Sequence, residues 1–122
     1  MTRILLAEDH AAVRASLAAF FEAQDDLEVV ATAADGREAV ALAAELAPDF
    51  VLMDIRMPLL DGIDATRLIR AARPETRVIL LSAYEQDDLM EAGAAAGAES
   101  FMLKGVPGAE LVAVIRKLRS RS

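Results

Sequence analysis

The segment Phe50-Val51-Leu52-Met53-Asp54 decides the fold, because it is apolar without interruption and then ends on a carboxylate. A strand that is buried on one face alternates apolar and polar residues, whereas a strand that is buried on both faces is apolar throughout. This segment is therefore predicted to be a central strand of a parallel sheet with helices on both faces. Similar short runs occur elsewhere in the chain, at residues 4–7, 27–33, 78–81 and 100–103.

Longer helical patterns alternate with these runs. They are expected at residues 11–24, at 39–46, from just after Gly62 to just before Pro74, at 87–96 and from Pro107 to Leu118, with Gly97 as a left-handed helix end. In the first pattern the apolar positions that share one helix face are Val13, Leu17, Phe20 and Phe21. Five βα units predict an α/β fold: a doubly wound, flavodoxin-like (βα)5 parallel sheet with strand order 2-1-3-4-5 in three α/β/α layers.

Length and composition limit the function classes. The 122 residues suffice for one domain, expected to span residues 1–122, and the 55% hydrophobic content excludes a disordered chain. There is no cysteine and one histidine, so any metal is expected to be held by oxygen. The net charge of −7 disfavours direct nucleic-acid binding by this domain. No apolar stretch is long enough for a membrane span or a signal peptide, so we expect a cytoplasmic domain with no membrane partner.

Polar residues follow the predicted strands, at the edge where doubly wound sheets bind ligands. Glu8 and Asp9 follow the first strand, and Asp54, Ser82 and Lys104 end or follow the third, fourth and fifth. Two carboxylates about 5–6 Å apart repel each other by roughly 3 kcal/mol at an effective dielectric constant near 20. A divalent cation would offset this repulsion, and a few carboxylates with retained waters are the usual ligands of Mg²⁺, for which Mn²⁺ can substitute.

Each of these residues also has an ordinary structural explanation. Asp9 could cap the first helix and Ser82 the fourth. Asp54 could be a simple strand-end acid, Lys104 a solvated charge, and His10 is better explained as a helix-start residue than as a participant. The occurrence of all these residue types at one edge of the sheet is what indicates a specific site. It predicts a phosphoryl-acceptor site in which Asp54 is the nucleophile, while Ser82 and Lys104 bind phosphoryl oxygens.

These residues resemble the receiver domain of two-component response regulators over nearly the whole chain. The matching motifs are Ile4-Leu5-Leu6-Ala7-Glu8-Asp9, Met53-Asp54-Ile55-Arg56-Met57-Pro58 with Asp61-Gly62, Leu81-Ser82-Ala83, Gly97-Ala98 and Phe101-Met102-Leu103-Lys104. Glu8-Asp9-His10 and Leu103-Lys104-Gly105 are most similar to receivers of the NarL/FixJ type. In this family Glu8 stands where Asp is frequent, Ser82 where Thr is, and Gly105 where proline is common.

The resemblance implies a site and a mechanism. Asp54 would be phosphorylated by a sensor histidine kinase, and Mg²⁺ would be bound by Glu8, Asp9, Asp54 and the backbone carbonyl of Arg56. Ser82 and Phe101 would act as the switch: Ser82 moves toward the phosphoryl group and Phe101 turns inward. The domain would not be an enzyme on other substrates, since it would catalyse only its own phosphorylation and dephosphorylation.

The resemblance also implies partners. Phosphorylation would promote a homodimer, either through the first and last helices or through the fourth helix, fifth strand and fifth helix. Receivers of this type usually precede a helix-turn-helix domain that binds DNA and controls transcription. Residues 119–122 are therefore expected to begin a linker to an output domain absent from this chain. Because cis peptide bonds are mainly a proline property, Gly105 leaves the isomer of the Lys104–Gly105 bond open.

Three alternatives to this hypothesis fit the sequence less well. A phosphatase of the haloacid dehalogenase type needs a D-x-D pair after the first strand, whereas Glu8 and Asp9 are adjacent here. A flavodoxin-like or dinucleotide-binding module needs a loop rich in Gly, Ser or Thr at that place. A degenerate receiver that acts only as a protein-binding module is disfavoured by the complete set of acids.

Overall fold

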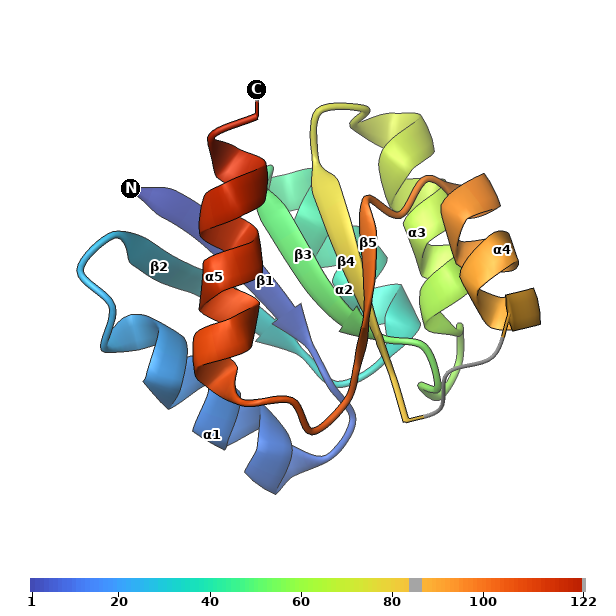
Figure 1. Ribbon diagram of the computed structural model, residues 1–122. Helices are drawn as coiled ribbons and strands as arrows, with labels where there is room; N and C mark the ends of the chain where they lie inside the picture. Colours follow the sequence, from blue (N-terminus) through green and yellow to red (C-terminus); the bar gives the residue numbers. More distant parts are fainter. Residues whose placement is uncertain (84–86, 122) are drawn as a thin grey trace.

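The computed structural model describes residues 1–83 and 87–121, and it consists of five βα units (Figure 1). The five strands form one parallel sheet in the order β2-β1-β3-β4-β5, which confirms the predicted topology. In chain order the elements are β1 (Thr2–Ala7), α1 (Ala11–Glu22), β2 (Leu27–Ala33), α2 (Gly36–Leu46), β3 (Phe50–Asp54), α3 (Gly62–Ala72), β4 (Arg77–Ser82), α4 (Asp87–Ala96), β5 (Ser100–Leu103) and α5 (Gly108–Arg119).

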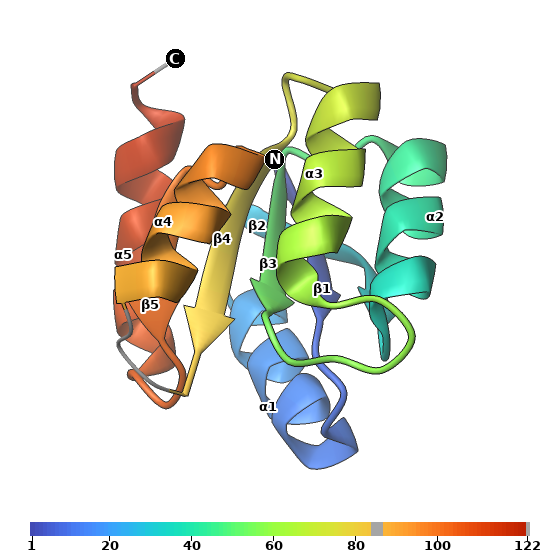
Figure 2. The same ribbon diagram turned by 90° about the vertical axis from the view of Figure 1, so that its right-hand side faces the viewer.

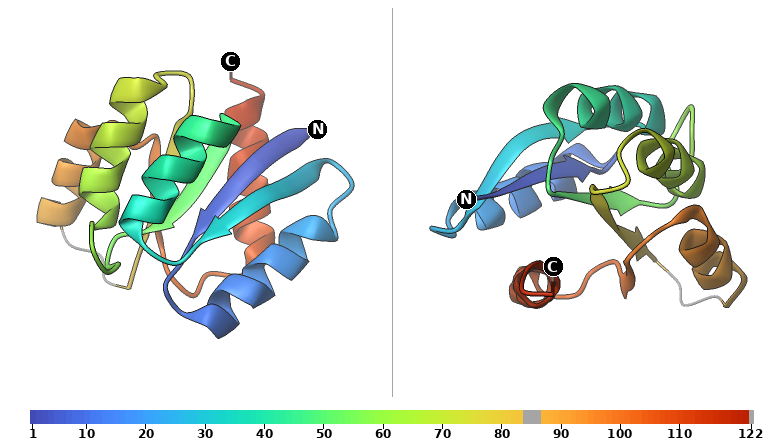
Figure 3. Two further views of the ribbon diagram at one scale, coloured as in Figure 1. Left: turned by 180° about the vertical axis from the view of Figure 1, so that it is seen from behind. Right: turned by 90° about the horizontal axis from the view of Figure 1, so that it is seen from above.

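Helices cover both faces of the sheet. Helices α1 and α5 lie on one face, and α2, α3 and α4 lie on the other (Figures 2 and 3). Successive side chains of a strand point to opposite faces, so each central strand serves two cores. In β3, Val51 and Met53 pack toward α2 and α3, whereas Phe50 and Leu52 pack toward α1 and α5. All five residues of β3 are buried, as its uninterrupted apolar sequence predicts.

The start of α2 and the end of α1 differ from the predicted helix boundaries. Helix α2 begins at Gly36 rather than at Ala39, because the Asp35 side chain accepts a hydrogen bond from the Glu38 amide and Glu38 in turn accepts one from the Ala34 amide. Helix α1 ends at Glu22, two residues before the predicted end. Helix α4 has the predicted bounds, and Gly97 after it has a φ of 108°, the left-handed conformation expected there.

The apolar face predicted for α1 is only partly buried. Phe21 is fully buried and Leu17 is partly buried, but Val13 and Phe20 are each more than a third exposed. Helix α1 lies over the β1–β2 side of the sheet with α5 beside it (Figure 3). Val13 lines the cavity between α1 and the β5–α5 segment, and the ring of Phe20 lies against Gly108 at the start of α5.

The C-terminal residues depart from the prediction of a linker over residues 119–122. Arg119 is the last residue of α5, and its guanidinium donates hydrogen bonds to Thr2 and Asp26. A linker can therefore start no earlier than Ser120, and Ser122 lies outside the described residues. Among the helices of the described part of the chain, none is long and apolar enough to cross a membrane.

Candidate functional site

The candidate site lies at the edge of the sheet where the parallel strands end. Asp54 is the last residue of β3, Ser82 is the last of β4, and Glu8 and Lys104 directly follow β1 and β5. The register pairs Ala7 with Met53 and Ser82 with Leu103, so the strand ends are level with one another. The Lys104 amide donates a hydrogen bond of 2.6 Å to the Ser82 carbonyl, which holds the two chain segments together.

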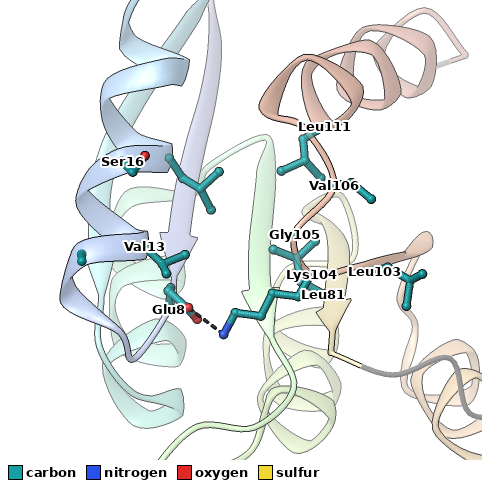
Figure 4. A pocket seen from close by; sticks show the side chains of 11 residues that line it. Glu8, Val13, Ser16, Leu81, Leu103, Lys104, Gly105, Val106 and Leu111 are labelled. Atoms are coloured by element: carbon teal, nitrogen blue, oxygen red, sulfur yellow. Dashed lines mark ion pairs between the residues drawn. The ribbon is translucent and has the colours of Figure 1, made fainter.

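The ammonium group of Lys104 joins two buried carboxylates. Its Nζ lies 2.7 Å from Glu8 Oε1 and 2.8 Å from Asp54 Oδ2. Figure 4 shows the Lys104 side chain extended from the segment after β5 toward Glu8. Glu8 is 1% exposed and Asp54 is 4% exposed. Because an unpaired buried carboxylate is strongly destabilising, these two acids depend on the single cation between them.

Burial and pairing shift two pKa values at this site. Burial raises the pKa of Glu8, and the neighbouring Asp54 carboxylate raises it further, against the opposing effect of Lys104. Burial by itself lowers the pKa of Lys104, but its pairing with the Asp54 and Glu8 carboxylates outweighs burial, so the pKa is raised overall. Lys104 is therefore positively charged at neutral pH.

Glu8, Asp9 and His10 form a second cluster next to this ion pair. Their side-chain ligand atoms all lie within 4.8 Å of one another. His10 Nδ1 is 3.2 Å from Asp9 Oδ1 and 3.5 Å from Glu8 Oε1. Asp9 Oδ1 and both carboxylate oxygens of Glu8 are buried atoms without a hydrogen bond. Buried carboxylate oxygens that lack donors are suitable ligands for a hard divalent cation, so these residues fit the predicted Mg²⁺. Asp54 is outside this cluster, and its carboxylate is paired with Lys104.

A cavity of about 210 Å³ connects the two groups of side chains. It is large enough for a phosphoryl group and several waters. Most of the residues predicted to form the site meet in it, since it is lined by Asp9, His10, Asp54, Ile55, Arg56, Ser82, Ala83 and Lys104. Arg56 is exposed and lies two residues beyond Asp54, while Ser82 is buried. Glu8 lines a different, mainly apolar cavity between α1 and the β5–α5 segment (Figure 4).

The predicted switch residue Phe101 lies in β5, half-buried against the core on the α3–α4 face. Gly93 of α4 lies next to its ring, but the close approach at Gly93 is to Leu80, because a Cβ there would lie 2.9 Å from Leu80 Cδ1 and 3.9 Å from Phe101 Cδ2. The Lys104–Gly105 peptide bond is trans, because no described residue has a cis peptide bond. Gly105 adopts a φ of 95°, and this left-handed conformation turns the chain toward α5.

Two features of the site were missed by sequence reasoning. His10 is the N-cap residue of α1, as predicted, but its side chain makes no capping hydrogen bond and faces the two acids. Asp9, considered as a cap, is not the N-cap. Arg14 also supports the site, because its Nη1 donates a 2.7 Å hydrogen bond to the Glu8 carbonyl. The only sequence signal for His10 was its position directly after two acids at a strand end.

Comparisons with known proteins show which proteins the chain is similar to. A family model described as "Response regulator receiver domain" matches residues 4–116. The transcriptional regulatory protein LiaR of Bacillus subtilis is 46% identical over 116 residues, which cover 95% of this chain and 55% of LiaR. The chain thus spans about half the length of the curated relatives it matches.

Solved structures give the same result. The response regulator domain of Thermotoga maritima CheB superposes with a TM-score of 0.88 at 37% identity, over 96% of this chain and 95% of that one. The signal receiver domain of the putative response regulator NarL from Mycobacterium tuberculosis has a TM-score of 0.91 at 29% identity, over 96% and 94% of the two chains.

Proposed function

The chain belongs to the response regulator receiver domain family, and from this premise we propose that Asp54 accepts a phosphoryl group from a phosphohistidine of a sensor kinase. The observation that carries this proposal is the pair of contacts from Lys104 Nζ to Asp54 and Glu8. They place a positive charge beside a buried carboxylate, in a cavity that the Ser82 side chain also lines.

In the proposed step an Asp54 carboxylate oxygen attacks phosphorus. The new O–P bond forms as the P–N bond to the donor imidazole breaks, and the imidazole nitrogen keeps the bonding electron pair. Lys104 would move from the Asp54 carboxylate to a phosphoryl oxygen, and Ser82 would donate a hydrogen bond to another. The phosphoryl group carries about −1.5 to −2 charge where the free carboxylate carries a single negative charge, so both groups stabilise the product more than the free carboxylate.

The proposal includes Mg²⁺ held by Glu8, Asp9, Asp54 and the backbone carbonyl of Arg56, with Mn²⁺ as a substitute. When bound, the cation supplies positive charge that offsets the negative charge of the carboxylates and of the transferred phosphoryl group. The buried oxygens of Glu8 and Asp9 that lack hydrogen bonds support this part of the proposal.

The output of the proposed switch is regulatory. Movement of Ser82 toward the phosphoryl group lets Phe101 turn inward, which changes the surface of α4, β5 and α5 and promotes a homodimer. The relative LiaR is named as a transcriptional regulatory protein. We therefore extend the proposal to control of a DNA-binding output domain in the cytoplasm, with no enzymatic action on a separate substrate.

Phosphorylation with a small donor tests the proposal. Incubation of the chain with acetyl phosphate and Mg²⁺ should add one alkali-labile phosphoryl group, located at Asp54 by mass spectrometry. Asp54→Asn should abolish labelling, whereas Asp25→Asn, an exposed acid far from the site, should not. Labelling that persists in Asp54→Asn, or that is unchanged by a chelator, contradicts the mechanism. Steady hydrolysis of an added phosphomonoester would instead indicate a phosphatase.

A further inference from the structure

The imidazole of His10 lies at the site, although a magnesium site made only of oxygen ligands does not require it. Its Nδ1, rather than a carbon edge of the ring, faces the acids, at 3.2 Å from Asp9 Oδ1. Two neighbouring ligand atoms of an octahedral ion, each about 2.1 Å from the metal, lie about 3.0 Å apart. The spacing of these two atoms is therefore close to that of ligands on one ion.

A second observation shows that this cluster is more than exposed acidic surface. Glu8 is 1% exposed, and both of its carboxylate oxygens, like Asp9 Oδ1, are buried without a hydrogen bond. Lys104 Nζ forms an ion pair with Glu8 Oε1, the oxygen that also lies 3.5 Å from His10 Nδ1. A buried carboxylate oxygen with no donor is costly, and a metal ion is one of the few groups that can offset this cost.

Ligand type decides which divalent ion such a cluster prefers. Carboxylate and carbonyl oxygens suit Mg²⁺, whereas imidazole nitrogen suits later transition metals, whose affinities rise from Mn²⁺ through Co²⁺ to Cu²⁺. The His10 side chain is 67% exposed, so it is free to adjust its position to an ion without repacking the core.

We propose that His10 Nδ1 is a metal ligand, so that Glu8, Asp9 and His10 together bind a nitrogen-accepting divalent ion such as Co²⁺ or Zn²⁺ more tightly than Mg²⁺. This inference rests on the proposed function and deepens it, because it names the metal class that the same site accepts. His10 thereby becomes a specificity-determining residue, whereas the carboxylates alone set the affinity for Mg²⁺.

The test compares Co²⁺ with Mg²⁺ by calorimetry on the full chain, with the visible absorption of bound Co²⁺ as a second readout. His10→Ala should weaken Co²⁺ binding about tenfold or more and shift its absorption, while the Mg²⁺ affinity changes less than about twofold. His10→Asn, which keeps a polar side chain but offers no imidazole, should behave like His10→Ala. Asp9→Ala should weaken both metals.

The composition makes this test specific, because the chain has one histidine and no cysteine. Any imidazole signal in the Co²⁺ spectrum therefore comes from His10. Equal affinities for Co²⁺ in wild type and His10→Ala, or an equal loss for Co²⁺ and Mg²⁺, would overturn the inference and leave His10 as a counter-charge to Asp9. Failure here is distinct from failure of the proposed function, which is measured separately by Mg²⁺-dependent labelling of Asp54.

Discussion

Lys104 Nζ lies 2.8 Å from Asp54 Oδ2, although the two residues are 50 positions apart in the sequence. The contact exists because β3, β4 and β5 are adjacent and parallel and end at the same edge of the sheet. Lys104 also pairs with Glu8, from the end of β1. Lys104 thus connects the ends of β1, β3 and β5 by ion pairs. One of its two partners is Asp54, the residue proposed to accept the phosphoryl group.

Replacement of Lys104 tests how far the buried acids depend on it. Lys104→Met leaves Glu8 and Asp54 without their shared cation, so we expect a loss of about 1–3 kcal/mol in the free energy of unfolding at pH 7 without divalent ions. Urea denaturation measures this loss. Lys117→Met is the matched control, because Lys117 is the other lysine of the chain and is exposed on α5; it should have little effect.

A double variant checks the cause of that loss. If the destabilisation comes from uncompensated carboxylates, Asp54→Asn should cost much less in the Lys104→Met background than in the wild type. Additive effects of the two substitutions would contradict the dependence inferred from the ion pair.

Gly62 is required where α3 approaches the strand that carries Asp54. A Cβ at Gly62 would lie 2.2 Å from the Asp54 carbonyl oxygen, and the clash involves backbone that cannot rotate away. Gly62→Ala should therefore destabilise the fold by about 2 kcal/mol or more, as measured by thermal or urea denaturation.

The control for Gly62 is Gly108, because both glycines are the first residue of a helix. A Cβ at Gly108 meets only the ring of Phe20, an exposed side chain that can move. Gly108→Ala should change stability by no more than about 0.5 kcal/mol. Similar losses at the two positions would show that the Asp54 backbone contact is unimportant.

Leu59 carries backbone strain in the loop after β3. It has a φ of 69° and is 71% exposed, so no burial offsets its left-handed conformation. Leu59→Gly should stabilise the protein by about 0.5–1 kcal/mol, because relief of strain exceeds the added entropy of the unfolded chain. Leu59→Ala removes the exposed side chain but keeps Cβ, so a comparable gain in melting temperature for this variant would refute the strain explanation.

Asp26 makes stability depend on pH. The hydrogen bond with Arg116 lowers the pKa of Asp26 well below its usual range, with a smaller contribution from Arg119. A carboxyl whose pKa is lower in the folded state stabilises the fold above its unfolded pKa, and this contribution is lost as the pH falls toward the folded value. Asp26→Asn should therefore destabilise the protein at pH 7 and progressively less below about pH 4.

Denaturation midpoints of wild type and variant across this pH range measure the effect of Asp26. The control is Asp25→Asn, since Asp25 is exposed and makes no ion pair among the described residues. A difference between wild type and Asp26→Asn that does not change with pH would exclude the two arginine contacts as its source.

Much of the site could be predicted from the sequence because strand ends are locally encoded. Each uninterrupted apolar run predicts a strand that is buried on both faces, and the residue that ends it is then placed at the ligand-binding edge of the sheet. Asp54 and Ser82 end their strands as predicted, and Glu8 and Lys104 directly follow theirs. The repeated βα pattern predicts a parallel sheet with right-handed crossovers, whereas the strand order 2-1-3-4-5 is that of the doubly wound family the chain resembles.

What only the tertiary structure decided is which side chains face each other across that edge. The pairing of Lys104 with both Glu8 and Asp54, the Nδ1 of His10 beside Asp9, and the close approach of Gly62 to the Asp54 carbonyl depend on register and rotamers. The exposure of Val13 and Phe20 likewise depends on where α1 lies relative to the sheet edge. The pattern of neighbouring residues along the chain determines whether a segment forms a helix or a strand and which of its faces is buried. These contacts instead join residues that are far apart in the sequence and meet only when the elements pack together.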